Sequence, residues 1–274
     1  MADHRNGFSY RFSHAIVRWP AESVVVGLRS NDGPPPDYSA FRAEHATYVA
    51  ALERAGLEVR TLPALEGYPD SVFVEDAALC LPEGAIVLRP GAPSRFGEAA
   101  AIEPALRDAF ASVKTLPPGG TVDGGDILVT ETGVFVGLSS RTDRAGIEAL
   151  AKILSTWGYV VETVPLPAGV LHLKSDCSLL DGETILVSPQ LAKAECFKRF
   201  RVLSTAAGEA PAANAVRIND RVLLADGYPR TAELLSQANY AVQPVSTVQA
   251  ACLDGGLSCL SLRYHEGPIL VDGA

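Results

Sequence analysis

The sequence predicts an α/β protein in which strand-strand-helix-strand units close into a ring. A hairpin pattern occurs five times along the 274 residues, and helix-like segments separate the hairpins. Asp76, Asp126 and Ser175 stand at similar places in three hairpins, about 50 residues apart. Repeats of this size are typical of propellers and arrays. Because the same polar strand end recurs in each unit, we expect these ends to converge on one axis.

Each hairpin is a short apolar strand with a polar end, a turn and a second apolar strand. The turns carry Gly, Asp-Gly, Glu-Gly or Asn-Asp, and the flanks alternate or run apolar, as hairpin strands do. The pattern is clear in residues 71–90, 121–139 and 170–189. It is fainter in residues 214–229 and 256–272.

Helical spacing of Ala, Leu, Arg and Glu predicts five helices between the hairpins. They are expected at residues 39–55, 97–111, 142–157, 189–202 and 231–238. Further strands are expected at residues 57–62, 113–116, 160–165 and 241–245. The segments PPGG and DGPPP are too short to separate independent cores, so we expect residues 1–274 to form a single domain.

The composition excludes several classes of partner. A net charge of −9 with scattered Lys and Arg argues against nucleic acid, and an acidic field favours a cationic ligand. No secretory signal is visible, and no apolar run approaches the ~18–20 residues that span a membrane. Five irregularly spaced cysteines without a C-x2-C pair indicate reduced thiols, so we expect a cytoplasmic protein with no metal and no cofactor. A homodimer is left open.

Polar side chains collect at the predicted strand ends. They comprise several carboxylates, one histidine, one lysine and one cysteine: Asp70, Glu75, Asp76, Asp123, Asp126, His172, Lys174, Asp254 and Cys259. A thiol nucleophile, a histidine that moves protons and a carboxylate that orients it are the groups that thiol catalysis needs. Singly, each has a plain structural explanation: Cys259 as a small buried residue, His172 as a hydrogen-bonded core histidine, DGGD as a turn. Their joint occurrence in repeated units favours a catalytic site.

A set of motifs, in order along nearly the whole chain, resembles that of the dimethylarginine dimethylaminohydrolases of the guanidino-group-modifying superfamily. The motifs are PDSVFVED, RPGAPSR, DGGD, VGLSSRT, LHLKS and LDGGLSCLS. DGGD alone is weak, whereas PDSVFVED followed by RPGAPSR is specific. The resemblance implies a five-bladed α/β-propeller with pseudo-fivefold ββαβ units, the pentein fold.

The resemblance also implies catalytic roles. Cys259 matches the nucleophile, His172 the general acid and base, and Asp123 the carboxylate that orients the histidine. Some relatives have Glu at the position of Asp123, which is one methylene longer. The implied reaction converts methylated arginine to citrulline and a methylamine through a covalent thiouronium on the cysteine.

The remaining implied residues bind the substrate, a small cationic amino acid. Those that match the guanidinium pocket are Asp70, Glu75 and Asp76, and those that match the α-carboxylate contacts are Arg95 and Arg141. Those that match contacts to the amino-acid end are Leu28, Leu253 and Asp254. The proline-rich loop at residues 31–39 falls where the family has a mobile lid, although three consecutive prolines are stiffer than a lid requires.

Two other functions stay open, and the first is a deiminase of arginine or of another small guanidino compound. Arginine deiminases typically carry an Asp two residues after the histidine, where this chain has Lys174, so the sequence favours methylated over unmethylated arginine. The shorter chain also has no room for the inserted helical domain of a deiminase. A third hypothesis is a metal-binding protein in which Cys259 and His172 hold zinc, although further ligands are not evident.

Overall fold

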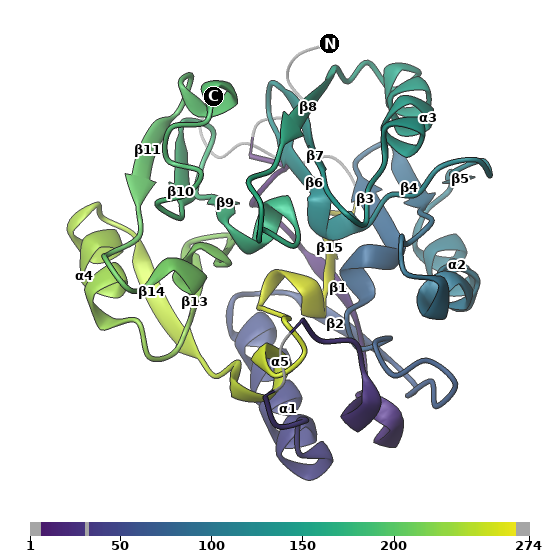
Figure 1. The fold of residues 1–274 in the computed structure, drawn as a ribbon, viewed down its shortest axis with the longest axis horizontal. Helices are drawn as coiled ribbons and strands as arrows, with labels where there is room; N and C mark the ends of the chain where they lie inside the picture. Colours follow the sequence, from purple (N-terminus) through teal and green to yellow (C-terminus); the bar gives the residue numbers. More distant parts are fainter. Residues whose placement is uncertain (1–6, 31–32, 267–274) are drawn as a thin grey trace.

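Five three-stranded sheets surround one axis, as Figure 1 shows, and confirm the predicted five-bladed α/β-propeller. The computed structural model describes residues 7–30 and 33–266. In ring order the sheets are β15 (Leu262–Tyr264), β1 (His14–Arg18) and β2 (Glu58–Leu62); β3 (Ala78–Leu81), β4 (Gly84–Val87) and β5 (Val113–Thr115); β6 (Ile127–Thr130), β7 (Gly133–Leu138) and β8 (Val161–Pro165); β9 (Cys177–Leu179), β10 (Thr184–Val187) and β11 (Arg201–Ser204); and β12 (Val216–Ile218), β13 (Arg221–Ala225) and β14 (Ala241–Val245).

Every sheet has the same strand directions. The middle strand pairs antiparallel with one neighbour and parallel with the other. A parallel pair needs a crossover, and in four sheets a helix supplies it. These helices are α1 (Tyr38–Arg54), α2 (Phe96–Ala109), α3 (Arg144–Ser155) and α4 (Pro229–Gln237), and a short α5 (Val248–Ala251) follows β14. The predictions for these four crossover helices are confirmed.

The helix predicted at residues 189–202 is wrong. The segment forms turns and one 3-10 turn, η6 (Glu195–Phe197), before β11 begins at Arg201. Its buried side chains are Leu191, Cys196, Phe197 and Phe200, so the i, i+3, i+4 spacing of a buried helix face holds for a single turn only. Aromatic packing of Phe197 and Phe200 on Phe135 closes this side of the sheet instead.

The ring closes by pairing the two ends of the described chain. β15 lies antiparallel to β1, with Tyr264 opposite His14. The sequence instead predicted that residues 256–272 form their own hairpin; its second half lies outside the described residues, and its first half joins a strand from the other end of the chain. Sequence spacing cannot reveal such a partner, because alternation specifies a strand's buried face but not its neighbour.

Most of the polar residues predicted to converge lie in 3-10 turns, or directly before them, and not at strand ends; one of the five such turns carries none of them. The turns are η2 (Val74–Ala77), η4 (Gly124–Asp126), η5 (Leu173–Ser175), η7 (Ala210–Ala213) and η8 (Ser258–Leu260), and each directly precedes the first strand of a sheet. The i→i+3 bond recurs, as in Asp126 N to Asp123 O at 3.0 Å and Ser175 N to His172 O at 3.1 Å. The hairpin predicted at residues 71–90 therefore begins later than expected, because its first apolar run, Val72-Phe73-Val74, forms turns and the first strand begins at Ala78. Short buried turns and strands have similar composition.

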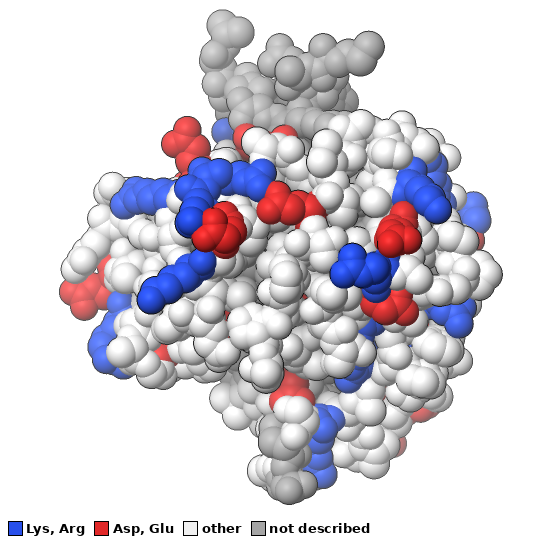
Figure 2. Space-filling view, turned by 45° about the horizontal axis from the view of Figure 1, so that its top comes forward, with Lys and Arg blue, Asp and Glu red and all other residues white. Residues whose placement is uncertain are grey.

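Basic and acidic side chains are interspersed on the face shown in Figure 2, with no broad basic area there. Such mixing does not provide the continuous positive surface that nucleic acid binding needs. Among the described residues, no helix is both long enough and apolar enough to cross a membrane.

The tight stacking of η2 on η4 gives a stability prediction. A Cβ on Gly124 would lie 1.9 Å from the carbonyl oxygen of Glu75, which is backbone and cannot rotate away. We expect Gly124→Ala to lower the free energy of unfolding by about 1–3 kcal/mol. Gly67→Ala is the matched control, because a Cβ there meets nothing within 4 Å. Urea unfolding of both variants measures the effect, and equal midpoints would contradict the packing described.

Candidate active site

Four of the 3-10 turns meet at one end of the axis and bring together the predicted catalytic residues. Contacts join η2 to η8, η2 to η4, and η4 to η5. As whole residues, Asp76, Asp123, His172 and Cys259 are 3%, 0%, 6% and 8% exposed. Because so little water reaches them, charge interactions among them are strong.

His172 and Asp123 form a buried pair. His172 Nε2 lies 3.0 Å from Asp123 Oδ2. Asp123 is itself fixed, because its Oδ1 accepts a hydrogen bond from Gly91 N at 2.6 Å and its N–H donates to Thr142 Oγ1 at 3.0 Å. A carboxylate held in this way fixes the orientation of the imidazole ring.

Neighbouring carboxylates keep His172 protonated. Burial alone would lower its pKa, but Asp76, the hydrogen bond to Asp123, and Asp126 together raise it to about 9. Asp126 also holds the turn that carries the histidine, since its Oδ1 accepts from Leu173 N at 2.9 Å. Gly125 lets the ring approach, because a Cβ there would lie 2.7 Å from His172 Nδ1.

Cys259 is a neutral thiol in this environment. Burial raises its pKa to about 12, and the negative charges of Glu75 and Asp76 act in the same direction. A cation bound beside the sulfur would reverse this effect, since opposite charge stabilises the thiolate. The nucleophile predicted from the sequence is therefore poised to ionise when a cationic ligand arrives.

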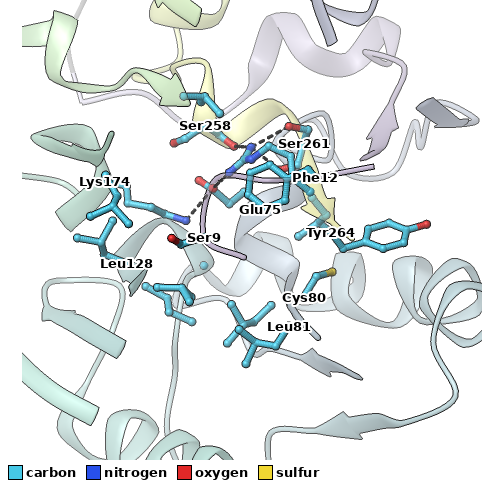
Figure 3. A pocket seen from close by; sticks show the side chains of 18 of the residues that line it. Ser9, Phe12, Glu75, Cys80, Leu81, Leu128, Lys174, Ser258, Ser261 and Tyr264 are labelled. Atoms are coloured by element: carbon cyan, nitrogen blue, oxygen red, sulfur yellow. Dashed lines mark hydrogen bonds and ion pairs between the residues drawn. The ribbon is translucent and has the colours of Figure 1, made fainter. Parts of the chain in front are cut away.

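Glu75 lies beside the thiol with one oxygen unpaired. Its Oε1 accepts from Lys174 Nζ at 2.7 Å and from Arg263 Nη2 at 2.9 Å, as Figure 3 shows. Its Oε2 is buried and has no hydrogen-bond partner among the described residues. A buried, unpaired carboxylate oxygen is costly, and a ligand N–H would satisfy it. Arg263 was not predicted. It alternates with the buried Leu262 and Tyr264, and this period-2 pattern is a signal that the sequence offered.

Arg95 lies within the carboxylate cluster and not at a distance from it. Its Nη1 is 2.5 Å from Asp76 Oδ2, and its Nη2 donates to Glu98 Oε2 at 2.7 Å and to Phe73 O at 2.9 Å. Burial alone would raise the pKa of Asp76, but the charges of Arg95 and His172 and the hydrogen bonds from Gly125 and Arg95 together lower it to about 2. Glu98 was not predicted, although its position three residues after Arg95 was a usable signal.

The three residues predicted for the amino-acid end of the substrate lie together, and Asp70, which was predicted for the guanidinium pocket, lies with them. Leu28 N donates to Asp70 Oδ1 at 2.9 Å, and a Cβ on the adjacent Gly27 would lie 2.9 Å from Leu253. Asp254 accepts hydrogen bonds from the backbone N–H and the hydroxyl of Ser30 at 2.5 and 2.9 Å. Asp254 therefore anchors the start of the proline-rich loop, whose residues 31 and 32 lie outside the described residues.

Arg141 differs from Arg95 in having an uncommitted guanidinium. It is half-buried, and within residues 7–30 and 33–266 its side chain makes no hydrogen bond or ion pair. It lies close enough to Asp70 to oppose the burial that raises the pKa of that carboxyl. Arg141 thus offers a free cation at the rim of the site.

The zinc hypothesis gains no support from the geometry. The described group of acidic and histidine side chains within 4.8 Å of one another is Asp76, Asp123 and His172, without Cys259. Asp76 is already paired with Arg95, which competes with a metal ion for the same oxygens.

Comparison with known proteins agrees with the fold and the motifs. The family model described as arginine deiminase matches residues 69–228. An N(G),N(G)-dimethylarginine dimethylaminohydrolase from Pseudomonas aeruginosa is 37% identical, and the match covers 92% of this chain and 100% of the relative. One from Streptomyces coelicolor is 34% identical over 92% of this chain and 97% of the relative.

A solved structure is similar across the whole fold. It is a cysteine-to-serine mutant of the Pseudomonas aeruginosa enzyme complexed with citrulline, with a TM-score of 0.90 and 36% identity. The match covers 93% of this chain and 100% of that one. With relatives this similar over nearly its full length, the chain belongs to the dimethylarginine dimethylaminohydrolase family, within the broader group that the arginine deiminase model describes.

Proposed function

We propose that the protein hydrolyses Nω-methylated arginines to citrulline and methylamines. The observation that carries this proposal is the buried group of Cys259, the His172–Asp123 pair and the carboxylates of Glu75 and Asp76. A planar guanidinium cation would pair with these carboxylates and provide the unpaired Glu75 oxygen with an N–H donor. Its positive charge would also stabilise the thiolate of Cys259.

The proposed reaction has two steps. Cys259 Sγ attacks the guanidinium carbon while protonated His172 donates its proton to the departing amine, and an S-alkylthiouronium forms. Neutral His172 then takes a proton from a water molecule, which attacks the same carbon, and citrulline and the thiol are released. Asp123 keeps the imidazole oriented in both steps.

The remaining proposals concern the residues that bind the rest of the substrate and the location and assembly of the protein. The free guanidinium of Arg141 suits the substrate α-carboxylate, while Arg95, already bound to Asp76 and Glu98, would have to share its remaining N–H. Leu28, Leu253 and Asp254 are proposed to surround the amino-acid end of the substrate, and Asp70 is proposed to line the guanidinium pocket. Five free thiols support a cytoplasmic enzyme. A homodimer and a single domain over residues 1–274 stay predictions.

Substrate choice separates the proposal from its alternative. Arginine as substrate is the second candidate, because the matching family model is described as arginine deiminase. Incubation with dimethylarginine or with arginine, scored for citrulline and for released amine, compares the two. We expect a higher kcat/KM for dimethylarginine, and the opposite ranking would favour the deiminase.

Cys259→Ser is expected to abolish turnover while leaving substrate affinity within about tenfold of the wild type, because an alcohol is far less ionised than a thiol. Mass spectrometry of wild-type enzyme quenched during turnover should show an adduct on the peptide that contains Cys259. Substantial citrulline formation by the serine variant would exclude the covalent route.

The pH dependence follows from the two raised pKa values. With His172 at about 9 and Cys259 at about 12, the resting pair near neutral pH is imidazolium and thiol. This state has one proton more than the reacting thiolate and imidazolium, so kcat/KM should rise about tenfold per pH unit. The rise in kcat/KM should stop near the pKa of His172. Above that pH the free enzyme has already lost one proton, so it holds as many protons as the reacting form. A flat profile from about pH 6 upward would contradict this protonation scheme.

Arg141→Ala is expected to raise KM by about 10- to 100-fold, since a hydrogen bond to a charged group contributes about 1.5–3 kcal/mol. The kcat value should change little, because the contact is the same before and during the reaction. Arg144→Ala, an exposed arginine on α3, is the matched control. An unchanged KM would remove Arg141 from the site.

A further inference from the structure

A cavity of about 130 Å³ lies where the first strands of the five sheets come together, and Figure 3 shows residues that line it. Residues of the first strand of every sheet line it, including Leu79, Leu128, Ser178, Val216 and Leu262. Residues of the catalytic turns also line it, namely Glu75, Gly124, Lys174 and Ser258, whereas Asp76, Asp123, His172 and Cys259 do not. The cavity thus reaches the back of the site and extends to the exposed Pro82.

Two hydroxyls in this cavity lack protein partners. Ser9 Oγ and Ser178 Oγ are buried, and neither makes a hydrogen bond within the part of the chain that the structure describes. Ser178 as a residue is 6% exposed. A water molecule needs about 10–15 Å³ by this measure and two or more polar partners, so the cavity has room for several. Unpaired hydroxyls in a cavity of this size indicate water.

Ser258 connects the cavity to the nucleophile. It lines the cavity, and its Oγ lies 4.0 Å from Cys259 Sγ. Its backbone is held on both sides, because its N–H donates to Asn214 Oδ1 at 3.0 Å and its carbonyl accepts from Arg263 Nη1 at 3.0 Å. The backbone that carries the hydroxyl is therefore held in place next to both the sulfur and the cavity.

We propose that the cavity holds water and that Ser258 passes the proton of the Cys259 thiol into it when the thiolate forms, a step that rests on the proposed hydrolase function. The S–H bond breaks and its electron pair stays on sulfur. Ser258 Oγ accepts that proton while its own hydroxyl proton moves to a cavity water. The proton then leaves through further waters to bulk solvent, and the negative sulfur faces the substrate cation.

This route solves a difficulty in the charge arrangement. His172 must stay protonated to donate to the departing amine, so it cannot also accept the thiol proton. The other charged groups near the sulfur are Glu75 and Asp76, with Lys174 and Arg263 behind Glu75. Asp76 and the Oε1 atom of Glu75 are already bound to cations, and the Oε2 atom of Glu75 is proposed to accept an N–H of the substrate. The hydroxyl of Ser258 is then the connection from sulfur to water.

The test compares Ser258→Ala with Ser258→Thr, which keeps the hydroxyl. Rapid-quench measurement of thiouronium formation from dimethylarginine should show at least about a tenfold slower step in the alanine variant and near wild-type rates in the threonine variant. The pH dependence of inactivation by iodoacetamide should be the same in all three proteins. That slow reaction reports the equilibrium ionisation of Cys259, which a kinetic relay does not change.

A second pair of variants tests the cavity itself. Ser178→Leu fills the space with an apolar side chain, whereas Ser178→Ala leaves it open. We expect slower thiouronium formation in the leucine variant only, again with unchanged iodoacetamide titration. This pair keeps the proposal testable if Ser258→Ala does not fold.

Each outcome decides between the possibilities. Wild-type rates in both Ser258→Ala and Ser178→Leu would overturn the relay, as would a slow step accompanied by a shifted iodoacetamide titration, which indicates distortion of the site. Failure of the wild-type enzyme to form citrulline would instead overturn the proposed function, because the relay is measured only in an active enzyme.

Discussion

The pairing of β15 with β1 is the interaction on which the active site depends. Cys259 lies in the turn directly before β15, so its position is set when that strand joins a sheet begun at the other end of the chain. A buried hydrogen bond of 2.6 Å between Tyr48 and Ser261 fixes the same strand to α1. Glu44 of α1 also binds the N–H groups at the start of α5, at 3.0 Å for Ala250. The same contacts therefore close the ring and position Cys259.

The second constraint is the balance of buried charge. Four buried carboxylates meet at the axis, and each is held by a cation or by backbone N–H groups: Glu75, Asp76, Asp123 and Asp126. Pairing offsets the large cost of burying charge, but it leaves the site negative enough to raise the pKa of both His172 and Cys259. The resting enzyme is thus an imidazolium and a thiol that await a cation. In the proposed function, the same carboxylates provide both specificity for a guanidinium and activation of the nucleophile.

Neighbouring residues in two of the turns differ in whether they line the cavity. Ser258 and Glu75 line the cavity, whereas the adjacent Cys259 and Asp76 do not, and Glu75 also lies close enough to Cys259 for its charge to raise the pKa of the thiol. A 3-10 turn produces this division because successive side chains project about a third of a turn apart. A strand in the same place would also alternate sides, which explains why the sequence pattern did not distinguish the two.

The sequence by itself determined the repeating units, four of the crossover helices and the set of residues that gather at the axis. Local periodicity and motif spacing depend on nearby residues, so they are readable without the fold. Only the tertiary structure decided that β15 completes the first sheet, that residues 189–202 form turns, and that Arg95 is bound to Asp76 and Glu98. It also decided which oxygens are paired, including the partners that Glu98 and Arg263 provide. These features depend on contacts between residues far apart in the chain, and alternation or spacing specifies which face is buried but not what it meets.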